Sequence, residues 1–349
     1  MRRRRRADRS GADVPRRRLI ALVDAPVPAP LHPALRFHNY TSFLRRRLGG
    51  PAVRLCVDGG FTCPNRDGTV GTGGCSYCDN DAFTPGIRFP GLPVDEQVRR
   101  SLPAARPGVP ARRYLVYFQK FTNTHAEPGA LRSRFHAAFA HPGVAGIVVG
   151  TRPDCLGEAA LDLLSEISRE RYVCVELGLQ SMSDDVLRRV NRGHTVADFA
   201  GGARTLVRRG IDVGAHLIYG LPGDTRGSFL SAARFLSGLG VCGVKLHHFH
   251  VVKGAPLEAA WHRGEVGVPE YEEYVNACAD FLERLSPGVA VMRMAGEAPD
   301  SLLVAPRWGK GPGDVARDVS ALLRRRGTFQ GASGNCSPEM EGRESRAGQ

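Results

Sequence analysis

Long apolar runs are missing from this sequence. No stretch of its 349 residues approaches the roughly 20 consecutive apolar residues that a helix needs to cross a bilayer. The short apolar run at residues 19–27 could pass for the core of a signal peptide, but prolines interrupt it and no clear small-residue cleavage pattern follows it. We therefore expect a cytoplasmic protein that does not associate with membranes.

Cysteine is scarce, and phosphate-binding glycine motifs are absent. Nine cysteines in 349 residues are too few for a disulfide-stabilised scaffold, and an odd number cannot pair completely. No G-x-x-x-x-G-K-[ST] motif is present, and the glycine-rich residues 71–74 lack the helix that a dinucleotide-binding turn requires. With 42% apolar residues the chain can nevertheless bury a large core, which excludes global disorder.

Positive charge is concentrated at the amino end. Residues 1–18 hold nine arginines against two aspartates, which gives +7 of the net charge of +13 and leaves about +6 for the remainder. These arginine runs lack periodic apolar partners and should be disordered. They could form a nucleic-acid-binding arm. A solvated tail, or a start codon assigned too early, is the simpler interpretation.

Three of the cysteines lie close together in the segment CPNRDGTVGTGGCSYCDN, residues 63–80. Cys63, Cys75 and Cys78 have the spacing C-x11-C-x2-C, in a stretch too rich in Gly, Asn and Asp for helix or strand. Three thiolates without a nearby fourth ligand suit a [4Fe–4S] cluster with one open iron, and the glycines let the backbone approach a bulky inorganic group. A structural zinc site ordinarily needs a fourth ligand. Zinc and three unrelated buried cysteines are the alternatives.

Apolar, β-rich segments alternate with helical patterns from residue 53 onward. This alternation, bounded by Gly and Pro, predicts parallel strands joined by right-handed crossovers. Polar residues recur at the expected carboxyl ends of the strands, where barrels carry their chemistry, so we predict an α/β fold with a partial (β/α)6 TIM-like barrel rather than an open doubly wound sheet. The expected strands are residues 54–57, 114–119, 146–151, 173–179, 213–219 and 244–252. The polar residues are Gln119, Thr151, Arg152, Gln180, His216 and His247.

The same patterns divide the chain into four regions. Residues 1–33 form a basic, disordered lead-in, and residues 34–255 form the barrel core. Residues 256–330 form a small C-terminal α/β extension, with a strand expected at 289–294 and helices at 270–285 and 315–326, and residues 331–349 form a frayed tail.

The cysteine segment and six further motifs together resemble the bacterial YhcC-like radical SAM proteins. These proteins are similar in turn to the catalytic subunit of Elongator and to the oxygen-independent coproporphyrinogen oxidases. The resemblance covers residues 39–312, and the further motifs are VYFQKFTNTHAE, VGTRPDC, VELGLQS, VNRGHT, HLIYGLPGDT and VKLHHFHVVKGAPL. It implies a [4Fe–4S] cluster that binds S-adenosylmethionine (SAM), an electron donor such as flavodoxin or ferredoxin, and cleavage of SAM to a 5′-deoxyadenosyl radical.

The resemblance assigns residues to these cofactors. Cys63, Cys75 and Cys78 match the cluster ligands, and Tyr77 matches an aromatic residue near the adenine of SAM. The other matches to SAM-binding positions are Gln180, Arg192, His216 and, less closely, Gln119. Two departures stand out: the first cysteine gap is eleven residues instead of the common three, and Gly150 replaces a glutamate that Elongator-like proteins carry.

Other residues are candidates for contacting a substrate. Lys245 and His247 share one face of the sixth expected strand and are interpreted as catalytic residues that point into the barrel, although a satisfied core histidine is an alternative. Asp154 and Glu176 could act as acid or base, and Asp154 could equally cap a helix. The substrate could be RNA, as the Elongator likeness and the basic charge suggest, or a small metabolite or peptide. A non-catalytic Fe–S or zinc-binding scaffold is the alternative from another class.

Overall fold

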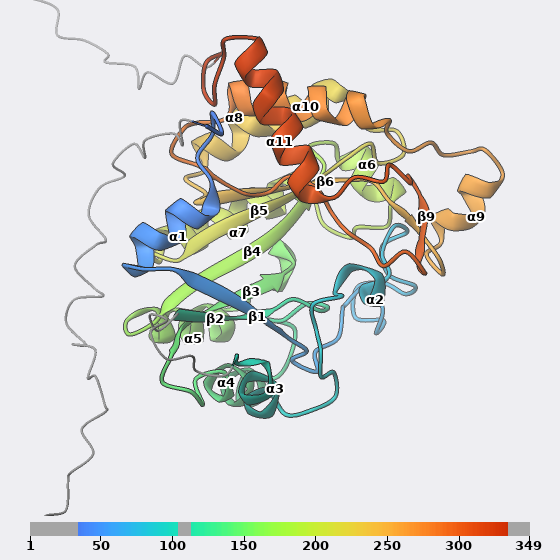
Figure 1. The fold of residues 1–349 in the computed structure, drawn as a ribbon. Coiled ribbons are helices and arrows are strands. Elements are labelled where there is room, and N and C mark those ends of the chain that lie inside the picture. The colour runs from blue at the N-terminus through green and yellow to red at the C-terminus, as the bar shows by residue number, and fades with distance from the viewer. Residues whose placement is uncertain (1–33, 104–112, 334–349) are drawn as a thin grey trace, which may run out of the picture.

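The computed structural model describes residues 34–103 and 113–333. Seven parallel strands form one sheet in the order β1-β2-β3-β4-β5-β6-β8, and the sheet curls into a partial barrel (Figure 1). The strands are β1 Ala52–Val57, β2 Arg113–Phe118, β3 Val144–Thr151, β4 Tyr172–Gln180, β5 Asp212–Tyr219, β6 Gly243–His248 and β8 Ala290–Arg293. A separate antiparallel pair joins β7 Val251–Val252 to β9 Leu303–Ala305.

Helices cover the outside of this sheet (Figure 1). The longer ones are α1 Tyr40–Leu48, α3 Val94–Ser101, α4 Pro128–Ala137, α5 Glu158–Ser168, α7 Val196–Arg208, α8 Arg226–Gly238, α10 Tyr271–Arg284 and α11 Pro312–Arg325. Shorter ones are α2 Asn80–Phe83, the 3-10 turn η1 Pro153–Cys155, α6 Asp184–Arg189 and α9 Leu257–His262. α1 contacts both edge strands, β1 and β8, so it fills the gap between the two open edges of the barrel.

The partial barrel is confirmed, with seven strands instead of six. The first five expected strands begin and end within two residues of the observed ones. The sixth divides into β6 and β7, because the chain leaves the sheet at Phe249, which is buried in an apolar cluster outside the barrel sheet. The strand expected in the C-terminal extension is β8, which pairs parallel with β6. The lead-in at 1–33 and residues 334–349 of the tail lie outside the described residues, whereas Ser333 still donates to the Glu283 carbonyl at 2.8 Å.

The inside of the barrel is layered, as β4 illustrates. Alternate residues of a strand point to opposite faces. Val173, Val175, Leu177 and Leu179 therefore pack toward the helices in the main core, whereas Tyr172 and Cys174 join an apolar cluster inside the barrel that α1 covers. Next along this inner face come Glu176, Gly178 and Gln180, which all line a cavity. Apolar packing thus closes one end of the barrel, and polar residues line the other.

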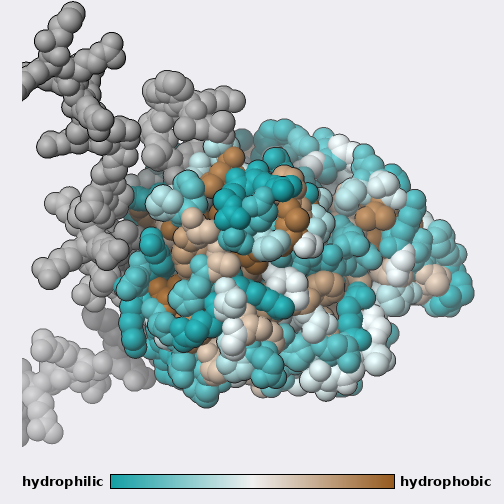
Figure 2. Space-filling view, turned by 90° about the horizontal axis from the view of Figure 1, so that it is seen from below, coloured by the Kyte–Doolittle hydropathy of each residue, from teal (hydrophilic) through white to brown (hydrophobic). Residues whose placement is uncertain are grey.

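The outer surface is predominantly polar. On the face shown in Figure 2, hydrophobic residues form only small, separate patches among hydrophilic ones. Within the described ranges the large apolar side chains that are clearly exposed are Val70 and Phe329. No helix among those residues is long and apolar enough to span a bilayer.

Candidate active site

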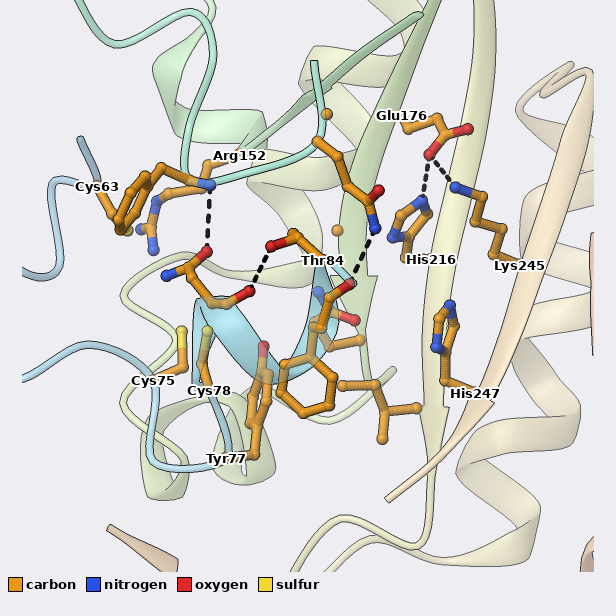
Figure 3. Close-up of a pocket in the computed structure, with 18 of the residues that line it drawn as sticks. Cys63, Cys75, Tyr77, Cys78, Thr84, Arg152, Glu176, His216, Lys245 and His247 are labelled. Carbon is orange, nitrogen blue, oxygen red and sulfur yellow. Dashed lines mark hydrogen bonds and ion pairs between the residues drawn. The ribbon is translucent and has the colours of Figure 1, made fainter. Parts of the chain in front are cut away.

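All ten residues predicted to bind a cofactor or substrate line one cavity at the carboxyl ends of the strands. Its empty volume is about 1290 Å³, open mouth included. The ten are Cys63, Cys75, Tyr77, Cys78, Gln119, Gln180, Arg192, His216, Lys245 and His247. Cys75 and Cys78 lie next to each other with Cys63 on the same side of the cavity, and Glu176, His216, Lys245 and His247 lie on the opposite side (Figure 3).

The long gap between the first two cysteines folds back on itself. The Pro64 carbonyl accepts hydrogen bonds from Val70 N at 2.9 Å and Gly71 N at 3.0 Å, and the Asn65 carbonyl accepts one from Gly74 N at 2.8 Å. Gly73 and Gly74 have φ angles of 76° and 80°, a left-handed backbone that favours glycine. The extra residues therefore form a compact loop that returns close to its starting point, so Cys63 stays on the same side of the cavity as Cys75.

Cys75 is surrounded by hydrogen-bond donors. Its Sγ accepts from Asn65 Nδ2 and from Arg192, each at 3.7 Å. The Asn65 amide also donates to the carbonyls of Asn191 at 2.7 Å and Arg192 at 3.0 Å, which ties the cysteine loop to the segment after α6. Burial, with Cys75 nearby, raises the pKa of the Cys78 thiol to about 12. Metal coordination would overcome this, because it deprotonates a thiol.

The cysteine side of the cavity fits an iron–sulfur cluster better than a single ion. No three His, Cys, Asp or Glu side chains in the described parts of the chain lie close enough together to hold one metal ion. In a [4Fe–4S] cluster the cysteines bind different irons, so their sulfurs need not converge on one point. The donors around Cys75 suit a thiolate ligand, since they would stabilise its negative charge.

Arg192 and Gln180 lie beside Gly178, between the two sides. The Arg192 guanidinium donates to the Gly178 carbonyl at 3.2 Å, and its buried Nε has no hydrogen-bond partner among the described residues. A Cβ atom at Gly178 would lie 2.5 Å from Gln180 Nε2 and 2.6 Å from Arg192, so only glycine permits this arrangement. A free donor on a buried arginine is suited to the carboxylate of a ligand such as SAM.

Tyr77 and Gln119 also line the cavity. Tyr77 is buried, with Cys75 and Val186 in the same apolar cluster, and Gln119 Nε2 donates to the Phe83 carbonyl at 3.0 Å, which ties β2 to the end of α2. Gly150 also lines the cavity, and a Cβ atom there would lie 3.2 Å from the Phe118 carbonyl. The backbone is therefore too close at this point to accept a larger residue without moving.

A buried charge network centred on Glu176 forms the opposite side. Its Oε2 accepts a 2.6 Å hydrogen bond from Tyr117, forms an ion pair with Lys245 Nζ, and lies 2.8 Å from His216 Nε2 (Figure 3). Lys245 also donates to Tyr117 at 3.0 Å, and Arg54 lies 3.4 Å from Glu176 Oε1. Side chains from β1, β2, β5 and β6 thus converge on one carboxylate, that of Glu176 on β4.

Burial and charge set the protonation of this network. Burial alone would raise the pKa of Glu176, but Lys245, His216 and Arg54 outweigh it and hold the pKa well below its usual range. Burial lowers the pKa of Lys245 to about 8, against the attraction of Glu176. Burial also lowers the pKa of His216, and Lys245 adds to the effect. Near pH 7, therefore, Glu176 and Lys245 are charged and His216 is neutral.

The histidines that follow Lys245 gather at the same cavity. His247 stacks on His216 with ring centroids 5.8 Å apart, and His248 and His250 stack on each other with centroids 4.0 Å apart. All three line the cavity, although His247 and His248 are neighbours within β6, and His250 follows after the chain has left the sheet. Asp154 caps no helix. It pairs with buried Arg152 at 2.7 Å, and Arg152 donates to the Arg192 carbonyl at 2.6 Å.

Several residues of the site were not predicted. Asn65 lies inside the cysteine motif, and its position two residues after Cys63 was the available signal. Tyr117 and Arg54 lie within strands, where alternation alone does not separate the inside of a barrel from the outside. Arg293, which lines the cavity from β8, was missed because β8 had been placed outside the barrel.

Two family models match most of the described chain. The model of the radical SAM superfamily matches residues 66–236, and that of the radical SAM C-terminal domain matches residues 241–324. The first match includes strands β2 to β5, and the second includes β6 to β9.

Similarity to individual proteins indicates the group within this superfamily. The chain is 38% identical to protein YhcC of Escherichia coli K12 over 266 residues, which is 76% of this chain and 85% of the relative. It is 32% identical over 162 residues to a tRNA uridine(34) acetyltransferase of Dehalococcoides mccartyi, covering 44% of this chain and 34% of that protein. The structure of archaeal Elp3 from Methanocaldococcus infernus superposes with a TM-score of 0.59 at 18% identity, covering 80% of this chain and 64% of Elp3, which shows a shared fold. The chain belongs to the radical SAM superfamily of enzymes, within the group of YhcC-like proteins.

Proposed function

We propose that this enzyme holds a [4Fe–4S] cluster through Cys63, Cys75 and Cys78, binds SAM beside it, and acts on its substrate with a 5′-deoxyadenosyl radical obtained by reductive cleavage of SAM. The observation that carries the proposal is that all ten predicted site residues line a single cavity, with the three cysteines together on one side. When bound, the cluster supplies the electron for cleavage, and a protein such as flavodoxin or ferredoxin would reduce it.

The protein's own share is to position and to shield. Asn65 and Arg192 donate to Cys75 Sγ and so orient one ligand. The unpartnered Nε of Arg192 would bind the SAM carboxylate, and Gln180 lies beside it. Buried Tyr77 lines the cavity beside Cys75 and Cys78 and would help to exclude water from the reactive species formed there.

The test is chemical analysis of protein reconstituted without oxygen. We expect about four irons per chain, as a [4Fe–4S] cluster requires, and 5′-deoxyadenosine formed from SAM after reduction with dithionite. The variant with Cys63→Ala, Cys75→Ala and Cys78→Ala should lose both, whereas Cys155→Ala, a free thiol outside this cavity, should retain both. Zinc in place of iron, or iron without SAM cleavage, would leave the non-catalytic scaffold as the better explanation.

RNA is a candidate for the substrate of this enzyme. It is supported by the similarity to the tRNA uridine(34) acetyltransferase, which extends over 44% of this chain. The test is salt-dependent RNA binding by the full chain and by a variant without residues 1–18. Binding that persists in the variant would place RNA recognition on the folded domain, and binding that disappears would assign it to the arginine-rich lead-in.

A further inference from the structure

The side of the cavity opposite the cysteines carries more cations than carboxylates. Lys245 and Arg293 line it and Arg54 lies behind it, whereas its carboxylates are Glu176 and Glu297. Glu176 pairs with Lys245 and Arg54, and Glu297 accepts from Arg293 at 2.8 Å. Three cations therefore share two carboxylates, which leaves one positive charge uncompensated.

The histidines His216 and His247 do not change this balance, but His247 offers a ring nitrogen without a hydrogen-bond partner among the described residues. Burial lowers the pKa of His247 well below its usual range, as it lowers that of His216, so both rings are neutral near pH 7. His247 Nε2 is buried and has no hydrogen-bond partner in the described structure. Gly296 packs so closely that a Cβ atom on it would lie 2.9 Å from His247 Nδ1, so the ring is held in place. An unpartnered buried nitrogen beside an excess positive charge is costly unless a ligand completes the site.

The cavity extends beyond the part proposed to hold SAM. Its lining runs from the three cysteines on one side to Glu176, His216, Lys245 and His247 on the other (Figure 3). If SAM occupies the cysteine side, as proposed above, the basic side is left for a second molecule.

We propose that the basic side of the cavity, formed by Lys245, Arg293 and His247, binds a carboxylate group of a small-molecule substrate. This inference rests on the proposed function, because SAM must fill the other side. One carboxylate carries the single negative charge that would balance the one uncompensated positive charge, whereas a phosphate monoester carries about −1.5 to −2.

The depth of the site favours a small molecule over RNA. The side chains of Lys245 and Glu176 are 6% and 0% exposed, so phosphates of a nucleic-acid backbone would not reach them. An RNA substrate would have to insert a base, as base-flipping enzymes require, and a base brings no negative charge.

The test compares matched probes by calorimetry on the reconstituted, SAM-bound protein. The probes are straight-chain monocarboxylates from acetate to octanoate and the corresponding primary amides, which have a similar shape and no charge. We expect at least one carboxylate to bind about tenfold more tightly than its amide, as one charged hydrogen bond would provide. Arg293→Gln should remove about the same factor, and Arg293→Lys should retain most of the affinity. Arg263→Gln, which alters an exposed pair with Glu265, should have no effect.

Three results would overturn the inference: equal affinity for acids and amides, no binding of any carboxylate, or affinity unaffected by Arg293→Gln. RNA binding that depends on Arg293 would overturn it in favour of a nucleic-acid substrate. Iron content and 5′-deoxyadenosine are measured separately on the same samples. Intact SAM cleavage without carboxylate binding therefore refutes this inference alone, and absent SAM cleavage refutes the proposed function.

Discussion

The phenol of Tyr117 donates a 2.6 Å hydrogen bond to Glu176, 59 residues further along the chain. The two residues lie on β2 and β4, with β3 between them. The β3 residue in register with Glu176 is Gly150, and a Cβ atom there would lie 3.8 Å from the Tyr117 ring. The missing side chain thus leaves the space across which the tyrosine reaches the carboxylate.

Removing the charge of Glu176 should destabilise the fold strongly. In Glu176→Gln, Lys245 and Arg54 lose their buried counter-charge, and the free energy of unfolding should fall by about 3–5 kcal/mol. The double variant with Lys245→Met should recover part of the loss, since it removes the unpaired charge. Urea denaturation measures both. Glu166→Gln breaks an exposed pair with Arg132 and should leave the free energy of unfolding nearly unchanged, because surface ion pairs contribute little. Equal losses of stability at the two positions would show that the buried network stabilises the fold no more than a surface pair does.

Gly178→Ala should weaken SAM binding and leave the fold intact. The new methyl group would meet the flexible ends of Gln180 and Arg192, which can move aside, but only by leaving their present positions. We expect SAM affinity to fall about tenfold, the equivalent of one charged hydrogen bond, as measured by equilibrium dialysis. The control is Gly201→Ala on α7, where an added Cβ atom would have no neighbour within 4 Å. This substitution should stabilise the helix by about 0.5–1 kcal/mol and leave SAM affinity unchanged. Unchanged SAM affinity in Gly178→Ala would mean that neither side chain contacts SAM.

Asn65→Leu should impair cluster retention. The substitution removes the donor to Cys75 Sγ and to the carbonyls of Asn191 and Arg192, so the cysteine loop loses its tie to the segment after α6. Iron content after desalting should fall well below that of the parent protein. Thr69→Ala, which affects only an exposed hydrogen bond to Asp67, should retain its iron. Full iron retention in Asn65→Leu would show that the loop holds its shape without this amide.

The fold should lose stability in mild acid through His38. Burial, with the Arg46 guanidinium nearby, lowers the pKa of His38 to about 4 from the ordinary 6.5. The unfolded chain therefore takes up the proton first as the pH falls, and the contribution of His38 to stability is lost progressively from about pH 6.5 down to about 4. Over this window we expect a loss of roughly 1–3 kcal/mol from this residue.

Urea denaturation at several pH values checks the His38 prediction. His38→Gln should show a shallower decline between pH 6.5 and 4 than the parent protein. His262→Gln, at an exposed position on α9, should follow the parent curve. Parallel curves for all three proteins would contradict the assignment.

From the sequence, the residues that gather at the cavity could be predicted better than the contacts between them. The cysteine spacing, the alternation of strands and helices and the motifs near strand ends depend on local patterns, and all ten predicted residues line one cavity. Even Glu176, considered only as a general acid or base, was recognisable as an unusual charge inside a β-rich run.

Only the tertiary structure determines which of these side chains contact one another. Arg54, Tyr117, Glu176 and Lys245 come from four strands, and which faces of those strands point inward depends on the curl of the whole sheet. The same holds for Arg293, because β8 is a short strand whose pairing with β6 no local pattern specifies. Local sequence sets which residues can form a strand or bind a metal, whereas the closure of the barrel brings distant charges within hydrogen-bonding distance.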